Sequence, residues 1–297
     1  MKFFLFILGL SLVLAGNSPT DITHLTEEAI YYASSAGTSG RDIYRISPDG
    51  GKPVRITHYK GRGHYPHHNS PKVSPDGTRL VYQNDTDGHD RYAIWVMNSD
   101  GSKQQRLTQK EGMYPNWSPD GKTIVFTGRR SGTWEILTVP ANGGAEALLT
   151  QNHKSAQKPG WGATSTYSAD GTQLFYSYVR EKVLYQMNLK SGEVSALSST
   201  NESVTHPIVS PDGKRIAANR KTGEGYKLVT MSTSGTDIKE VVSNVVSYSP
   251  PAWSPDGKAL LFAGMVNGNQ ELFKVDMETG KETRLTSNND FDALPTW

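Results

Sequence analysis

The stretch Tyr114-Pro-Asn-Trp-Ser-Pro-Asp-Gly121 decides the fold, because four other parts of the chain repeat most of its letters. The serine that opens the Ser-Pro-Asp-Gly part recurs with spacings of 44, 50, 42 and 44 residues, at Ser74, Ser118, Ser168, Ser210 and Ser254. A period of roughly 40 to 50 residues, with several short strands in each unit, is typical of a β-propeller or a similar repeat array.

The third repeat shows how four strands fit into one unit. In its turn at Ser118 to Gly121, proline presets φ, aspartate can accept bonds from nearby amides, and glycine tolerates a positive φ. We expect a first strand ending at Trp117, further strands at 123–127, 134–139 and 146–150, a loop at 128–132 and a tight turn at 142–144. Four such antiparallel strands make one propeller blade.

The two ends of the chain are predicted to share one blade. Ser47-Pro-Asp-Gly50 lies only 27 residues before Ser74 and follows the apolar run 43–46, so it belongs between the third and fourth strands of a first blade. The second strand of that blade is expected at 29–33, and its first strand at 292–297, where Pro-x-Trp recurs. The prediction is an all-β, six-bladed β-propeller with four antiparallel strands per blade, closed by the C-terminal strand.

The N-terminus is typical of a secretory signal peptide. A lysine at position 2, an apolar run at 3–15 and small residues after it follow the usual order of such a leader. The apolar run of 13 residues is shorter than the roughly 17 to 25 that span a membrane, although an uncleaved anchor is the alternative. We therefore expect a signal peptide at 1–16, a single propeller domain at 17–297, and a periplasmic or secreted protein.

Composition excludes several classes of function. A net charge of +2, from 31 basic and 29 acidic residues, argues against a nucleic-acid partner. The chain has no cysteine, which excludes disulfides, thiolate metal sites and a cysteine nucleophile. It also lacks the nucleophile elbow Gly-x-Ser-x-Gly, the phosphate loop and the His-Glu-x-x-His zinc motif. We expect a monomer with no membrane span after signal cleavage.

The repeat Pro-x-Trp-Ser-Pro-Asp-Gly-Lys, followed by an apolar strand, a Gly-containing turn and a closing Arg-Leu-Thr, resembles the TolB-type β-propeller repeat. The resemblance covers residues 22–297 and leaves no room for the α/β domain that precedes the propeller in TolB, a periplasmic partner of the Pal lipoprotein. It implies a TolB-like propeller by itself. The same repeat also occurs in oligogalacturonate lyases and in peptidase propellers, so it implies the fold more firmly than the function.

The strand order places the two tight turns of each blade on one face of the disc and the remaining connections on the other, which we call the variable face. The connections between second and third strands are expected to be loops, among them 128–132, 219–225 and 264–269. Binding residues concentrate on such connections, held by a rigid scaffold. The predicted ligand-binding residues are His64, Tyr65, His67, His68, Tyr114, Arg129, Arg130, Trp161, Arg180, His206, Arg220, Tyr248, Asp290 and Asp292. The aromatic members, with Phe291, could stack on sugars or pack the blade entrances, and the arginines could hold carboxylates.

The densest group of polar residues combines histidines at 64–68 with an Asp-rich segment at 85–90. Imidazole with carboxylate suits a transition metal, and closely spaced Asp oxygens suit calcium. The possible metal ligands are His67, His68, Asp85, Asp87, His89 and Asp90. The alternative is an ordinary solvated polar loop.

Two functions follow from these observations. The first is a non-enzymatic module of the cell envelope that binds a protein or a glycan through the variable face. The second is a carbohydrate-active enzyme, a metal-assisted polysaccharide lyase or hydrolase that resembles oligogalacturonate lyase and uses His64, His67, His68 and His89. No catalytic residue can be assigned from the sequence.

Overall fold

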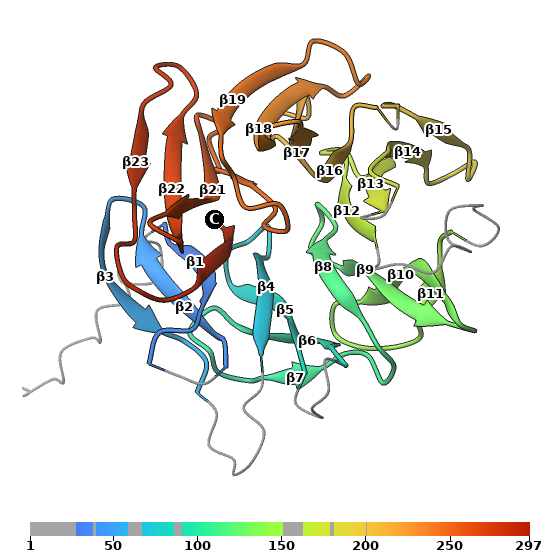
Figure 1. The fold of residues 1–297 in the computed structure, drawn as a ribbon. Coiled ribbons are helices and arrows are strands. Elements are labelled where there is room, and N and C mark those ends of the chain that lie inside the picture. The colour runs from blue at the N-terminus through green and yellow to red at the C-terminus, as the bar shows by residue number, and fades with distance from the viewer. Residues whose placement is uncertain are drawn as a thin grey trace, which may run out of the picture.

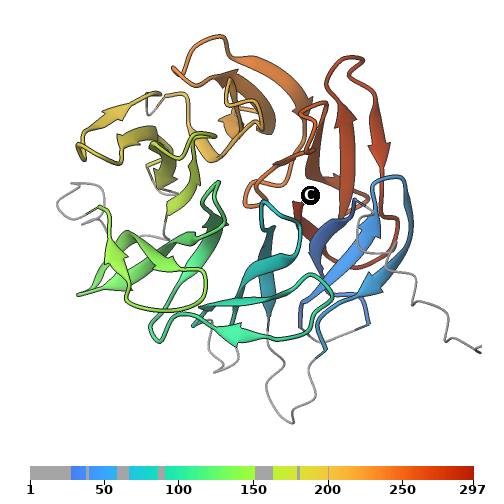
Figure 2. The same cartoon turned by 180° about the vertical axis from the view of Figure 1, so that it is seen from behind.

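The structure is a computed structural model that describes residues 28–37, 40–58, 67–85, 91–150, 163–178, 181–199 and 201–297. Its strands form six antiparallel sheets of four strands, arranged as blades around a central axis (Figures 1 and 2). The predicted six-bladed propeller is confirmed. The leader predicted at 1–16 lies outside the described residues.

Every blade runs from an innermost strand near the axis to an outermost strand at the rim. In that order, blade 1 consists of β24 (Asp292–Thr296), β1 (Ile30–Ser34), β2 (Asp42–Ser47) and β3 (Gly50–Arg55). Blade 2 consists of β4 (His68–Val73), β5 (Arg79–Asn84), β6 (Ala93–Asn98) and β7 (Gln105–Arg106). Blade 3 consists of β8 (Met113–Trp117), β9 (Thr123–Arg130), β10 (Thr133–Pro140) and β11 (Ala147–Leu148).

The other three blades follow the chain in the same order. Blade 4 consists of β12 (Ala163–Tyr167), β13 (Gln173–Tyr178), β14 (Leu184–Asn188) and β15 (Val194–Ala196). Blade 5 consists of β16 (Val204–Val209), β17 (Arg215–Thr222), β18 (Gly225–Ser232) and β19 (Lys239–Ser243). Blade 6 consists of β20 (Ala252–Trp253), β21 (Ala259–Val266), β22 (Asn269–Asp276) and β23 (Glu282–Arg284).

The ring closes as the sequence predicts. β24 pairs antiparallel with β1 through Tyr31 and Thr296, Ala33 and Ala293, and Ser34 and Asp292. The last strand and the first three of the chain therefore form one sheet, which closes the ring.

The Ser-x-Asp-Gly turn is built by the same hydrogen bonds in every repeat. In the third repeat the Ser118 hydroxyl donates to Asp120 Oδ1 at 2.6 Å and accepts from the Thr123 N–H at 3.0 Å. The Gly121 N–H donates to the Ser118 carbonyl at 2.9 Å, and Gly121 has a φ of 68°. These turns lie opposite the variable face and are scaffold.

Apolar faces of neighbouring blades form the core. Trp117 of blade 3 is buried against blade 2, where its indole N–H donates to the Lys72 carbonyl at 2.9 Å and the Arg79 guanidinium lies 4.9 Å from its ring. Trp253 repeats this role one half-turn round the ring, donating to the Ile208 carbonyl at 3.2 Å. Burial of these faces is what makes each blade depend on its neighbours.

Three of the long loops predicted between second and third strands are tight hairpins. β9 and β10 extend through the expected loop 128–132 and leave only Ser131 and Gly132, both with positive φ, between them. The expected loops at 219–225 and 264–269 are hairpins as well, the second turning at Asn267 and Gly268. Two consecutive residues with positive φ form a type I′ turn, whose twist matches that of the strands, so the strands continue to the turn. The fourth strand of blade 3 is correspondingly shorter than the predicted 146–150.

Candidate functional site

The predicted site residues divide into those the structure describes and those it does not. His64, Tyr65, Asp87, His89, Asp90, Trp161 and Arg180 lie outside the described residues. The others fall into four places: a buried histidine network, an exposed aromatic stack, the innermost strands, and the outer part of the variable face.

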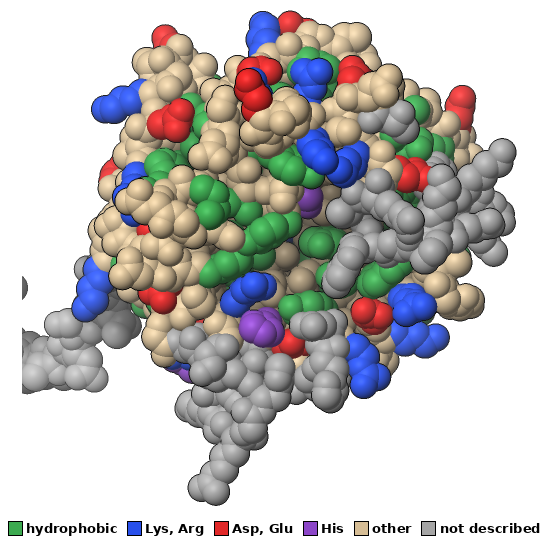
Figure 3. Space-filling model, viewed as in Figure 1, with side chains coloured by type: hydrophobic (Ala, Val, Ile, Leu, Met, Phe, Trp, Pro, Cys, Tyr) green, Lys and Arg blue, Asp and Glu red, His purple; other side chains and the backbone are tan. Residues whose placement is uncertain are grey.

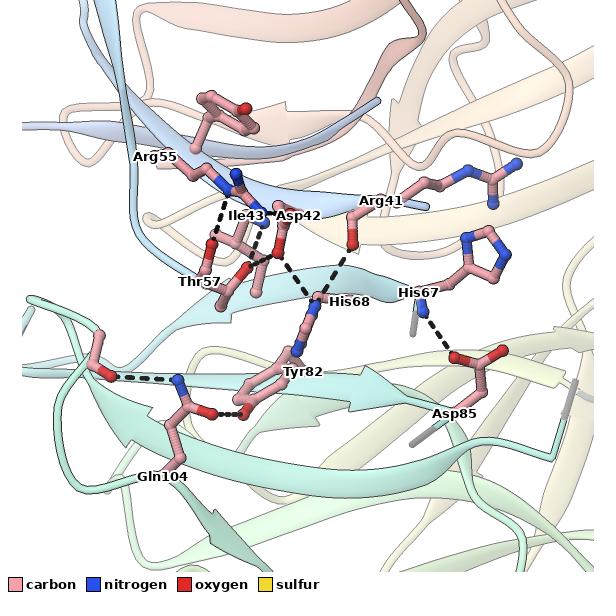
Figure 4. A network of polar contacts seen from close by, with 12 residues as sticks. Arg41, Asp42, Ile43, Arg55, Thr57, His67, His68, Tyr82, Asp85 and Gln104 are labelled. Carbon is pink, nitrogen blue, oxygen red and sulfur yellow. Dashed lines mark hydrogen bonds and ion pairs between the residues drawn. The ribbon is translucent and has the colours of Figure 1, made fainter. Parts of the chain in front are cut away.

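His68 belongs to a buried hydrogen-bond network between blades 1 and 2 (Figure 4). Its Nδ1 lies 3.2 Å from Asp42 Oδ1 and 3.3 Å from the Arg41 carbonyl oxygen. Asp42 is fully buried and also receives bonds from Arg55 Nη2 and the Thr57 hydroxyl, each at 2.6 Å. Such a network satisfies the buried carboxylate, so His68 positions blade 2 against blade 1.

The partners of His68 are part of the repeat. In blade 6 the fully buried Glu271 takes the place of Asp42, and it accepts from Arg284 Nη2 at 2.9 Å and from the Thr286 hydroxyl at 2.7 Å. Blade 3 has the threonine–acid bond without the arginine: the Thr150 hydroxyl donates to Glu135 at 2.8 Å, and Leu148 stands in the position of the arginine. An acidic residue near the start of the third strand therefore binds the arginine and the threonine of Arg-x-Thr at the fourth strand, and these bonds join the two strands; we call this arrangement the acid–Arg–Thr lock. The closing Arg-Leu-Thr of the sequence repeat supplies that lock.

His67 contacts the Asp85 side chain through its backbone N–H group. The His67 N–H donates to Asp85 Oδ1 at 2.5 Å, and Asp85 is fully buried. Within the described ranges no group of three or more His, Asp or Glu is close enough to hold a metal ion. Because half of the possible ligands lie elsewhere, metal binding stays a prediction.

A stack of two half-buried side chains and one exposed one lies at the variable face between blades 6 and 1. The Arg41 guanidinium is 4.2 Å from the centre of the Phe291 ring, and the Tyr248 ring is stacked on Phe291 with ring centres 6.3 Å apart and planes 8° apart. Tyr248 is 40% exposed, and its hydroxyl donates to Gln270 Oε1 at 2.6 Å. We call Arg41, Phe291 and Tyr248 the aromatic stack.

The backbone beneath the aromatic stack is fixed by buried polar groups. Ser35 and Phe291 exchange bonds at 3.0 Å, from the Ser35 N–H to the Phe291 carbonyl and from the Phe291 N–H to the Ser35 hydroxyl. Next to Tyr248, the Ser249 hydroxyl accepts from the Leu294 N–H at 2.9 Å, and the Ser249 carbonyl accepts from Asn219 at 2.9 Å. The stack is therefore presented by a rigid base, as binding loops on a scaffold usually are.

The acidic residues predicted at this face take different positions. Asp292 is fully buried, accepts from Asn288 Nδ2 at 2.7 Å, and has its pKa raised mainly by burial, with the nearby Glu271 adding to the effect. Asp290 is half-buried, and its N–H donates to Asn288 Oδ1 at 2.7 Å. The Asp292 carboxyl therefore lies inside the fold, and ligand binding by Asp290 and Asp292 stays a prediction.

Tyr114 and His206 lie on the innermost strands, at equivalent positions. Each precedes a proline and has an unusual positive φ, 52° for Tyr114 and 59° for His206, and Ser70 and Leu294 repeat the feature in blades 2 and 1. The strand pairing shifts register at these points in β4, β8 and β16. A bulge of this kind turns a side chain out of the regular pleat, and positive φ outside glycine is costly.

The predicted arginines lie further out. Arg130 is held by Glu146, with Nη2 and Nε at 2.6 and 3.0 Å from Oε2, whereas Arg129 is exposed on the same hairpin. Arg220 is half-buried near the end of β17, opposite Val204. The structure thus brings Tyr248 together with Phe291, and it leaves the arginines dispersed. Sequence reasoning missed Arg41, because no repeat carries a matching arginine at this position.

On the face shown in Figure 3, hydrophobic side chains gather toward the middle of the disc, with basic and histidine side chains beside them. Among the described residues there is no helix that could cross a membrane.

Comparison with known proteins agrees with this architecture. Residues 63–165 match the family model described as TolB beta propeller domain, and the chain is a propeller of the TolB type. Two relatives are the uncharacterized peptidase YuxL of Bacillus subtilis, 29% identical over 214 residues, and the Tol-Pal system protein TolB of Francisella tularensis, 26% identical over 237 residues. These alignments cover 69% and 76% of this chain but only 30% and 51% of the relatives, so the chain spans about half of that TolB and less of YuxL.

Solved structures show the same fold. TolB from Acinetobacter baumannii superposes with a TM-score of 0.77 at 20% identity, covering 91% of this chain and 66% of its own. An oligogalacturonate lyase in complex with manganese superposes with a TM-score of 0.52 at 19% identity, covering 88% of this chain and 73% of its own. At these identities the likeness concerns the fold alone.

Proposed function

We propose that the protein is an exported TolB-like propeller that binds a protein or a glycan in the cell envelope through the aromatic stack. The observation that carries this proposal is the stack itself: an arginine over one aromatic face, a second aromatic ring beside it, and an exposed tyrosine edge on a rigid base. Tyr, Arg and other aromatic residues are the side chains that most often dominate binding energy at interfaces. The same pair of rings also offers a flat surface for a sugar.

The location rests on two supports. The N-terminal sequence is typical of a leader, and among the relatives is TolB, a protein of the Tol-Pal system. Both favour an envelope role for the propeller. The lyase alternative has only the fold in its support, since the His68 side chain serves blade packing.

Site-specific photo-crosslinking in cells tests this proposal. A photoreactive phenylalanine analogue placed at Tyr248 is expected to give a defined covalent adduct, and the same analogue at Lys122 on the turn face is the control. Lys122 is suitable because its side chain is 81% exposed, so it is free to react with whatever lies near that face. Adducts at both positions to the same extent, or at neither, would contradict the proposal; a carbohydrate adduct and a protein adduct distinguish its two forms.

A further inference from the structure

A small cavity lies on the propeller axis, away from the aromatic stack. It has a volume of about 190 Å³. Its lining comes from five of the six innermost strands or the turns after them, and includes Lys72, Asn116, Ile208, Ala252, Thr296 and Trp297. The first five of these residues each follow the repeat proline of their own blade, so the repeat itself brings them to one level of the axis.

Within the part of the chain that the structure describes, Lys72 is the only residue with a charged side chain that lines this cavity. It is half-buried, and no acidic side chain of the described residues lies within ion-pair distance of its ammonium group. Burial lowers the pKa of Lys72 to about 8, so the group is still mainly protonated at neutral pH. A half-buried cation with no acidic side chain at ion-pair distance is unfavourable, and a bound anion would reduce that cost.

His206 lies across the axis from Lys72. Each innermost strand contacts the next round the ring, which places β4 of blade 2 and β16 of blade 5 on opposite sides (Figure 1). His206 is 2% exposed, and neither of its ring nitrogens has a hydrogen-bond partner among the described residues. Burial, with the Lys72 charge as a second cause, lowers its pKa to about 4, so at neutral pH the ring is uncharged and has one N–H to donate.

The geometry points to a site for one small monocarboxylate on the axis, bound by the Lys72 ammonium group with the Thr296 hydroxyl as a neighbouring donor, and with the His206 ring on the opposite strand just outside the cavity lining. The Thr296 hydroxyl accepts from the Val73 N–H at 3.3 Å, which leaves its own proton available to a ligand. The single positive charge of Lys72, beside a neutral histidine, balances one negative charge. A dianion such as phosphate would leave one negative charge without a partner. Charge-assisted hydrogen bonds of this type are about twice as strong as neutral ones. This inference does not depend on the proposed function.

Imidazole NMR tests the site directly. The purified protein is titrated at pH 7 with sodium acetate, or with sodium chloride at the same ionic strength, while long-range ¹H–¹⁵N spectra follow the His206 ring, assigned with the His206→Gln variant. We expect a saturable shift with acetate and none with chloride. The Lys72→Met variant should bind acetate on the order of tenfold more weakly, and Lys122→Met, on the exposed turn face, should bind like wild type.

The wild-type protein provides a readout that needs no variant. Bound acetate should raise the pKa of Lys72 above its acetate-free value, as followed by the ¹³Cε shift, because a neighbouring anion stabilises the charged form. The inference is overturned by an unchanged Lys72 pKa at saturating acetate, by equal responses to acetate and chloride, or by equal acetate affinity in Lys72→Met.

Discussion

At the scale of single residues, the aspartate of each Ser-x-Asp-Gly turn shows most clearly how a repeated residue fixes the local structure through its hydrogen bonds. The Asp120 carboxylate accepts from the Ser118 hydroxyl at 2.6 Å and from the Lys122 N–H at 3.1 Å. These bonds, the serine bond first, hold the pKa of Asp120 below its ordinary value, and Asp76, Asp170, Asp212 and Asp256 repeat the effect. The carboxylate form is therefore the one that the fold stabilises.

This lowered pKa predicts an acid-sensitive contribution to stability. A folded-state pKa below the unfolded one contributes stability that is present above the ordinary value of 3.8 and is lost as the pH falls through the folded-state value. The Asp120→Asn variant should melt below wild type at pH 7, and the difference should shrink as the pH is lowered below about 4. Melting curves from pH 7 to pH 3 measure it. A difference that stays constant over that range would refute this role for Asp120.

At the scale of elements, the last strand is the one whose place matters most. Ala293 and Leu294 of β24 are buried in one cluster with residues of blades 1 and 6, so β24 packs against both its own blade and blade 6. Without it, blade 1 would expose the inner edge of β1. A sheet edge without a partner is also a site of aggregation.

Deleting part of β24, or truncating one of its buried side chains, should therefore destabilise the whole propeller. Deletion of 294–297 is expected to cause a large fall in Tm, and Leu294→Ala alone should cost about 2–5 kcal/mol, as for other buried leucines. Leu148→Ala is the matched control, because Leu148 is 40% exposed on the outermost strand of blade 3. Thermal unfolding of the three variants gives the comparison, and an unchanged melting curve for the deletion would rule out closure by β24.

The sequence predicts some of these elements better than others, for physical reasons. The turns, the blade count and the closure follow from periodic residues, because their roles are local or repeat with the period. The loop predicted around Ser131 and Gly132 is wrong, since Ser-Gly does not distinguish a type I′ turn from a longer connection. The aromatic stack joins Arg41 to Phe291, which are 250 positions apart, and such a contact depends on ring closure rather than on any local pattern.

At the scale of the whole molecule, the residues that repeat in every blade differ in position from those that occur once. Repeated residues form the turns, the core and the acid–Arg–Thr locks, whereas Arg41, Phe291 and Tyr248 have no counterparts in the other blades. His68 shows the limit of reading function from composition, because a conspicuous histidine belongs to the packing of two blades. The residues that differ between repeats include the aromatic stack, through which we propose that this propeller binds.

Binding through the aromatic stack is tested most directly by the Kd of purified variants for the partner captured at position 248. Phe291→Ala and Tyr248→Ala should each raise that Kd on the order of tenfold or more, as truncation of an aromatic hot spot does. Val54→Ala, at an exposed apolar residue on the outermost strand of blade 1, should leave it unchanged. Wild-type affinity in both stack variants, with their folds intact, would contradict binding through the stack.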